Sequence, residues 1–206
     1  MLRLGPLLWA AGITAAITLT TAPAGADLAP PDYASYHAQR AYRQALMALR
    51  LGETDAALRT ASEAVALTPE DPQALYLLGI CQLFDEQYEQ AGTTLERAIA
   101  IDPELPEAVH DLGLVRLHLG QGDEAAELFA FVSLMMPESW VGPYREAQTA
   151  ALLRRDFDAC EGHLREALRR GFPWLASLPV EPEWAAVAED PAFVAMVGRL
   201  LEQPGG

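Results

Sequence analysis

The fold of this chain is decided by a short stretch that recurs three times. Residues 91–103 read AGTTLERAIAIDP, and the same outline is found in ALRTASEAVALTP at residues 57–69 and in AAELFAFVSLMMP at residues 125–137. Pro69, Pro103 and Pro137 end the three stretches at intervals of 34 residues. Internal repeats with periods of about 20–50 residues are typical of arrays in which similar units stack on one another.

Each repeat has the pattern of two amphipathic helices joined by a turn. Around the turn at residues 85–87, apolar and small residues recur at helical spacing in two sets. The sets are Ala74, Leu75, Leu78 and Cys81, and Tyr88, Ala91, Leu95, Ala98 and Ile99. Small residues let two helices approach to about 8–10 Å, so we expect Gly79 to meet Ala91 and Ala98. The proline then ends the second helix, because it lacks an N–H and disfavours helical backbone at the preceding residue.

These features resemble the tetratricopeptide repeat, a helix–turn–helix unit of 34 residues. The motifs that carry the resemblance are Leu78-Gly79, Leu112-Gly113, Ala125, Phe129 and the three prolines. The aromatic residue usual at the start of the first helix is absent. The resemblance implies an all-α fold, a right-handed α-solenoid of antiparallel helix pairs, with repeats at 38–71, 72–105, 106–139 and 140–171. The fourth repeat needs one extra residue in its turn near Arg154 and Arg155.

Residues 172–206 differ from the repeats and are predicted to form a C-terminal cap. Gly171 closes the last repeat helix, since glycine tolerates the left-handed conformation. A short helix is expected to begin at Glu181-Pro182-Glu183-Trp184, and a longer one after Asp190, a favourable N-cap. The order of these motifs is similar to the end-of-group segment of many bacterial repeat arrays. Such a segment would cover the apolar face of the last repeat.

Residues 1–26 are predicted to be a cleaved export signal. Leu4 to Leu19 form an apolar run, and Ala24-Gly25-Ala26 fits the form that signal peptidase reads. The run is short for a bilayer span of about 20 residues, so an uncleaved N-terminal anchor is the alternative. We expect a periplasmic or secreted protein in which residues 27–37 lead into the array, with no later stretch able to span a membrane.

The charge of the chain excludes several classes of partner. It has 14 basic residues, all arginine, against 29 acidic ones, a net charge of −15. Cleavage would remove Arg3 and leave −16. Such acidity argues against binding to nucleic acid or to an anionic membrane. The apolar fraction of 51% excludes an acidic disordered chain.

The chemistry-bearing residues predict no enzyme, no cofactor and no metal. His110 and His118 share one helix but lie about 12 Å apart along its axis, too far to hold a metal by themselves, since Zn–N bonds are about 2 Å. Cys81 and Cys160 are separated by two repeats, whereas a disulfide needs Cα atoms within about 7 Å. We therefore expect two buried free thiols.

The resemblance implies that the first helices of successive repeats line a concave face. It places these residues there: Tyr42, Leu46, Tyr76, Ile80, Leu83, Phe84, His110, Leu114, Leu117, His118 and Tyr144, with Gln148 and Ala151 in the fourth repeat. The face is mostly aromatic and aliphatic. One interpretation is a groove for an extended peptide or an amphipathic helix. The other is that these side chains pack on neighbouring helices or on residues 27–36, without a ligand.

The function predicted from these features is a non-enzymatic scaffold of the bacterial cell envelope that binds a protein or peptide partner in its groove. The alternative is an accessory subunit of an envelope assembly or secretion complex, which docks by its convex face or its cap. Chaperone-binding members of the resembled family hold a terminal carboxylate with lysine and asparagine. This chain contains neither residue type, which argues against that ligand.

Overall fold

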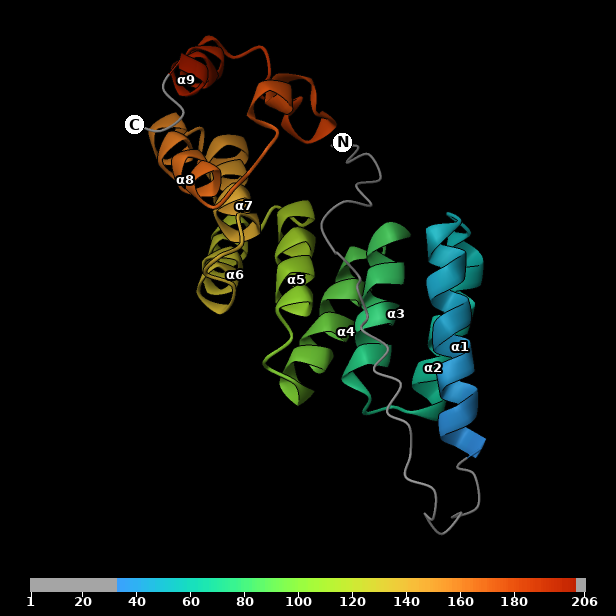
Figure 1. Cartoon of the computed structure of the whole chain (residues 1–206). Coiled ribbons are helices and arrows are strands. Elements are labelled where there is room, and N and C mark those ends of the chain that lie inside the picture. Colours follow the sequence, from blue (N-terminus) through green and yellow to red (C-terminus); the bar gives the residue numbers. More distant parts are fainter. Residues whose placement is uncertain (1–32, 203–206) are drawn as a thin grey trace. The chain divides into compact units, whose positions relative to one another are not determined.

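The computed structural model describes residues 33–202, in which helices follow one another as hairpins (Figure 1). The first structural unit contains four helices: α1 (Tyr33–Arg50), α2 (Thr54–Leu67), α3 (Pro72–Phe84) and α4 (Tyr88–Ile101). The second unit begins at Asp102. Its repeat helices are α5 (Pro106–His118), α6 (Gly122–Met135), α7 (Val141–Thr149), the π-helical turn η1 (Ala150–Arg154) and α8 (Phe157–Arg169). Its C-terminal elements are the 3-10 helices η2 (Leu175–Val180) and η3 (Pro182–Trp184) and the helix α9 (Pro191–Glu202).

The helices keep the period of the sequence. The second helices of the first three hairpins begin at Thr54, Tyr88 and Gly122, at intervals of 34 residues. Consecutive helices pack against each other, α1 with α2, α3 with α4, α5 with α6 and α7 with α8. No strand occurs among residues 33–202. The predicted all-α fold of consecutive helix pairs is therefore confirmed.

The first helix begins before the repeat that it opens. It begins at Tyr33, so residues 33–37 of the predicted lead-in are helical. Neither proline nor glycine interrupts the sequence between Tyr33 and Arg50, so nothing forces a later start. The predicted export signal and residues 27–32 lie outside the described residues.

Each hairpin turn contains one residue with left-handed backbone. These residues are Gly52 (φ 73°), Glu86 (φ 60°), Gly120 (φ 74°) and Arg155 (φ 52°). The residue after each of them donates its N–H back to the end of the first helix, for example Gln121 to the Arg116 carbonyl at 2.8 Å, which satisfies a carbonyl that the helix leaves unpaired.

The fourth turn comes 35 residues after the third, not 34. The helix absorbs the additional residue as the π-helical turn Ala150–Arg154, because a π-bulge adds one residue without ending a helix. The extra residue predicted near Arg154 and Arg155 is confirmed, and the structure shows how it is accommodated.

The nearest neighbour of Gly79 within its hairpin differs from the prediction. The atoms nearest to a Cβ added at Gly79 belong to Leu95, whose side chain lies 2.7 Å away, and not to the predicted Ala91 or Ala98. The equivalent Gly113 would meet Phe129 at 2.5 Å. Glycine is thus needed because a large side chain from the second helix lies across the first helix at this level.

The second helices of the first three repeats end just before the repeat prolines, as predicted. Helices α2, α4 and α6 all end two residues before Pro69, Pro103 and Pro137. The intervening Thr68 and Met136 have φ of −135° and −127°, outside the helical region, as expected for residues that precede proline.

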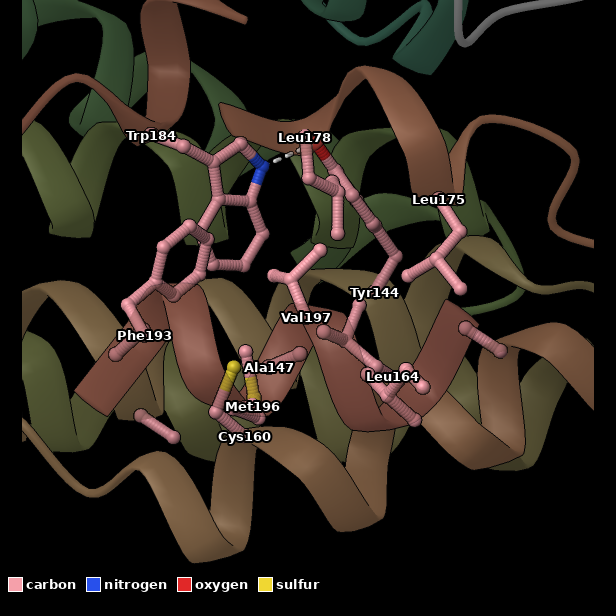
Figure 2. Close-up of a cluster of buried hydrophobic side chains, with 14 of the residues drawn as sticks. Tyr144, Ala147, Cys160, Leu164, Leu175, Leu178, Trp184, Phe193, Met196 and Val197 are labelled. Carbon is pink, nitrogen blue, oxygen red and sulfur yellow. Dashed lines mark hydrogen bonds between the residues drawn. The ribbon is translucent and has the colours of Figure 1, made fainter. Parts of the chain in front are cut away.

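Each unit has its own core. In residues 33–101, small side chains dominate, with Ala45, Ala57 and Ala61 packed against Leu77 and Cys81. In residues 102–202, the core combines α7 and α8 with the C-terminal elements, and Trp184, Phe193 and Met196 are fully buried in it (Figure 2). Cys81 and Cys160 are buried free thiols, as predicted.

The C-terminal elements are held on the last hairpin by polar contacts as well. Asp190 directly precedes helix α9, and its carboxylate accepts from the Ala192 N–H at 2.9 Å, which confirms the predicted cap residue. Arg199 of α9 donates to Glu161 of α8 from its Nε at 3.1 Å. This hydrogen bond, together with those from Arg165, lowers the pKa of Glu161 despite partial burial. The helix predicted at residue 181 is the single 3-10 turn Pro182–Trp184.

None of the helices within residues 33–202 has the length and apolar character that crossing a membrane requires.

Candidate functional site

The predicted groove residues of the first unit lie on α1 and α3 and differ in how accessible they are. Tyr42 and Leu46 are half-buried on α1, at the edge of the alanine-rich core. On α3, Leu83 is half-buried and Phe84 is 41% exposed. Tyr76 and Ile80 are each 8% exposed and belong largely to the interior. Of these six predicted groove residues, Phe84 is thus exposed and Leu83, Leu46 and Tyr42 are partly accessible.

Tyr42 joins this surface to the core. Burial raises the pKa of its hydroxyl, and the nearby carboxylate of Asp71 raises it further. Asp71 itself is the N-cap of α3, where its side chain accepts from the Gln73 N–H at 2.9 Å. The phenol is therefore neutral and can take part in hydrogen bonds without adding charge to an apolar face.

The groove residues of the second unit are more engaged within the protein. His110 of α5 is 8% exposed. Its Nε2 accepts from Arg145 Nε at 3.3 Å, which places its proton on Nδ1, the atom that donates to Asp111 at 2.8 Å. Leu114, Leu117 and His118 are half-buried. The face of α5 thus offers less open apolar surface than that of α3.

Tyr144, predicted as a groove residue, lies under the C-terminal segment instead. It is 8% exposed, and its ring packs against Phe172 with centroids 4.9 Å apart. Its hydroxyl accepts from the indole N–H of Trp184 at 2.9 Å (Figure 2). Burial and the charge of Glu183 both raise the pKa of Tyr144. The expectation of an open groove at α7 is therefore wrong, because residues 172–184 cover that face.

A buried charge pair fixes the C-terminal segment to α7. Arg145 and Glu183 are 5% and 4% exposed, and Arg145 Nη1 donates to Glu183 Oε2 at 3.0 Å. The same Oε2 accepts from the Tyr144 hydroxyl and from Gln148 Nε2, each at 3.2 Å. Arg145 also donates to Gln148 Oε1 at 2.8 Å. Buried charges are tolerated when paired and fully hydrogen-bonded in this way.

The sequence and structure comparisons agree on the family. Residues 42–106 match the family model of the tetratricopeptide repeat. The chain carries tetratricopeptide repeats. A search of curated proteins found no match.

Solved structures with this fold share about a fifth of their sequence with the chain. A crystal structure of MamA is 20% identical, with a TM-score of 0.61, over 65% of this chain and 77% of that one. TTC0263, a thermophilic tetratricopeptide repeat protein of Thermus thermophilus, is 20% identical, with a TM-score of 0.60, over 80% and 97%. The first such domain of Spaghetti (RPAP3), solved with an HSP90 peptide, is 16% identical, with a TM-score of 0.56, over 58% and 95%. At these identities the likeness shows the fold.

The residues that occupy the repeat face at α7 were not predicted from the sequence. Arg145 was a visible signal, since it and Glu146 are the only charged residues in residues 140–153. Its acidic partner could not be identified, because Glu183 lies 38 residues further along the chain. Only the packing of the C-terminal segment brings the two together.

A second polar feature lies among the helices of the last two repeats. A pocket of about 560 Å³ is lined by residues of α6, α7, η1 and α8, including Glu127, Glu146 and His163. Glu146 accepts from the Ser133 hydroxyl at 2.6 Å and faces His163 Nδ1 at 3.2 Å. Both oxygen atoms of the Glu146 carboxylate therefore have partners within the protein. Among residues 33–202, no group of three or more His, Cys, Asp or Glu side chains has a metal-binding arrangement.

Proposed function

We propose that this tetratricopeptide repeat chain is a non-catalytic scaffold that binds an apolar peptide or amphipathic helix on the α1–α3 surface. Tetratricopeptide repeats are protein-interaction modules, and the repeat face is where the resembled family binds its ligands. The observation that carries the proposal is the contrast between repeats. At α7 the face is covered by residues 172–184, whereas at α3 Phe84 is 41% exposed beside Leu83. An exposed aromatic residue next to aliphatic ones is the typical anchor of a binding site.

The expected ligand has little charge where it meets this surface. Apart from Arg50, which occupies the repeat position of Phe84, the groove residues predicted on α1 and α3 are uncharged, and Tyr42 is held neutral. A ligand recognised through a terminal carboxylate, such as the HSP90 peptide of the RPAP3 domain, does not fit this chemistry. Apolar side chains at i, i+3 and i+4 of a helix, or alternate side chains of an extended segment, do fit it.

The test is selection of ligands from a random peptide-display library, followed by affinity measurement with a labelled selected peptide. We expect peptides with apolar anchors, and F84E should weaken their binding about tenfold or more, because it places a charge in the contact. Circular dichroism checks that F84E keeps the parent helix content. A library that yields no ligand, or ligands that bind F84E as they bind the parent, would count against the proposal.

A further variant tests the alternative function, in which the chain docks by its convex face. Phe131 and Leu134 of α6, a second helix of its repeat, are 47% and 77% exposed. F131E should leave peptide affinity within about twofold of the parent. If F131E abolishes binding while F84E does not, the contact lies on α6 and the chain fits the accessory-subunit model better.

We also propose that the scaffold works in the cell envelope, after export and cleavage near Ala26. The apolar run of residues 4–19 and the Ala24-Gly25-Ala26 motif support this location. N-terminal sequencing of the chain recovered from fractionated bacteria tests it. A mature chain that begins at Asp27 is the expected result, and an intact Met1 in the cytoplasmic fraction would contradict it.

A further inference from the structure

The outer face of α1 carries exposed side chains over its whole length. Tyr36, Met47 and Leu51 are 58%, 58% and 65% exposed. On a helical wheel the exposed residues from Tyr36 to Leu51, the residue after the helix end, fall on one continuous arc opposite the buried Ala41 and Ala45. The arc consists of Tyr36, His37, Gln39, Arg40, Arg43, Gln44, Met47, Arg50 and Leu51.

Three central positions of this arc are buried in the next repeat. Residues 34 positions after Arg40, Arg43 and Met47 are Ala74, Leu77 and Cys81, with exposed fractions of 2%, 1% and 0%. These three pack in the clusters that contain Ala57, Ala61 and Ala64 of α2. The part of the outer face of α1 around Arg40, Arg43 and Met47 therefore corresponds to a repeat-stacking face, and among the described residues no preceding helix packs on it.

The charge of this face is opposite to that of the rest of the chain. Residues 33–51 contain three arginines and no acidic residue, within a chain of net charge −15. Within residues 33–202, none of Arg40, Arg43 and Arg50 forms an ion pair; Arg43 Nε donates to the Gln39 carbonyl of its own helix at 3.3 Å. A purely solubilising end repeat would need only a polar face, yet this one mixes cations with large apolar side chains.

We propose that the outer face of α1 docks an acidic amphipathic helix of a partner protein. The helix would stack on α1 as α2 stacks on α3, with its apolar stripe on Met47 and Leu51 and its carboxylates toward Arg40 and Arg43. An anionic membrane would also attract arginines, but the net charge of −15 opposes the approach of the whole molecule to such a surface. A partner helix contacts α1 alone and avoids that repulsion.

The experiment uses two synthetic stapled helices with the same Leu/Ala stripe, one flanked by glutamates and the other by lysines. Binding to the purified chain is measured by fluorescence anisotropy. The glutamate helix should bind at least about tenfold more tightly than the lysine helix, and raising the salt concentration from about 50 to 500 mM should weaken it. The double substitution R40E/R43E should reduce its affinity about tenfold or more.

The matched control is R59E/R97E, which reverses two exposed arginines on α2 and α4 of the same unit. It should leave the affinity within about twofold. F84E should also leave the affinity for the glutamate helix unchanged, because Phe84 lies outside the exposed arc of α1. A failure of the peptide site at α3 can therefore be distinguished from a failure of this proposal.

Three results would overturn the proposal. They are equal binding of the two helices, no binding of the glutamate helix, and an equal loss of affinity in R40E/R43E and R59E/R97E. Vesicles of phosphatidylglycerol provide the membrane comparison, with phosphatidylcholine as the reference. If R40E/R43E abolishes binding to the anionic vesicles and the glutamate helix does not bind, α1 is a lipid contact rather than a docking site for a helix.

Discussion

At the scale of single residues, the hairpin turns show where the repeat departs from its most favourable sequence. Two of the four left-handed turn positions are glycines, but the others are Glu86 and Arg155. A residue with a Cβ loses about 1–2 kcal/mol in this conformation. Arg155 is compensated by contacts with the C-terminal segment, to the Ala186 carbonyl at 3.2 Å and to Asp190 at 3.5 Å. Glu86 is exposed, and the φ of the equivalent Gly52 and Gly120 differs from its own by less than the usual scatter.

We predict that E86G stabilises the protein by about 1 kcal/mol. Glycine relieves the left-handed strain but is more flexible in the unfolded chain, so the gain is smaller than the full strain. The free energy of unfolding from urea titration, followed by circular dichroism, measures it.

Two matched substitutions check this reasoning. E89G, in the first turn of α4, also removes one negative charge but should lower the free energy of unfolding by about 0.5–1 kcal/mol, because glycine is unfavourable in a helix. R155G should gain less than E86G, since it also loses the contacts of Arg155. Equal effects of E86G and E89G would show that charge, not backbone strain, is responsible.

At the scale of elements, the C-terminal segment acts as part of the last repeat. Residues 172–202 contribute Phe172, Leu178, Trp184, Phe193 and Met196 to the core of α7 and α8. Trp184 stacks on Phe193 with ring centroids 5.4 Å apart (Figure 2). The segment thereby covers both the apolar side of α8 and the repeat face of α7. In the second unit, the predicted groove residues that this segment leaves uncovered therefore lie on α5.

We predict that a chain ending at Gly171 aggregates or unfolds at a lower temperature. Losing one buried Trp or Phe side chain costs about 3–5 kcal/mol, and the deletion removes three of them while leaving Arg145 buried without its partner. This sum is comparable with the whole stability of a domain, about 5–15 kcal/mol. Differential scanning calorimetry and light scattering measure the outcome. An unchanged melting temperature in a monomeric chain would show that the segment does not act as a cap.

At the scale of the whole molecule, each structural unit contains one buried thiol. Cys81 lies in the first unit and Cys160 in the second. Burial raises the pKa of both thiols to about 12, with the charges of Asp156 and Glu161 adding to the effect at Cys160. Both are neutral near pH 8, so a thiol reagent reacts only when the surrounding structure opens. In repeat proteins stability is roughly a sum of local terms, so opening of one unit need not open the other.

We predict that E183Q speeds thiol labelling of Cys160 but not of Cys81. Breaking a buried ion pair costs about 3–5 kcal/mol, so the labelling rate of Cys160 in a C81A chain should rise about a hundredfold or more. Cys81 in a C160A chain should react within about twofold of its parent rate. Mass spectrometry after timed labelling with a maleimide measures both rates.

The control is E189Q, which neutralises an exposed carboxylate in the same segment and should change neither rate. Equal acceleration of both cysteines by E183Q would show that the two units open in one cooperative step. Acceleration by E189Q equal to that by E183Q would remove the buried ion pair as the cause.

The sequence by itself determined the features that depend on neighbouring residues. The 34-residue period, the helix ends before Pro69, Pro103 and Pro137, and the closing glycine at Gly171 follow from backbone chemistry that acts over a few residues. The burial of Cys81 and Cys160 was also predictable, because the helical period places them on inward faces. The extra residue near Arg154 could be counted from the repeat alignment, although its form as a π-helical turn could not.

Only the tertiary structure decided which groove positions are open. Tyr42, Tyr76, His110 and Tyr144 occupy the same repeat position, yet Tyr144 is sealed by residues 172–184 and His110 is bound to Arg145. The sequence could not separate them, because the residues that cover Tyr144 lie about 30–40 positions away and are brought there by packing. The α1 face is exposed for the same reason. In the next repeat the residue equivalent to Arg40 is Ala74, which the preceding helix α2 buries. Periodicity specifies which side of a helix is a contact surface, but the neighbours present in three dimensions decide whether that surface is filled.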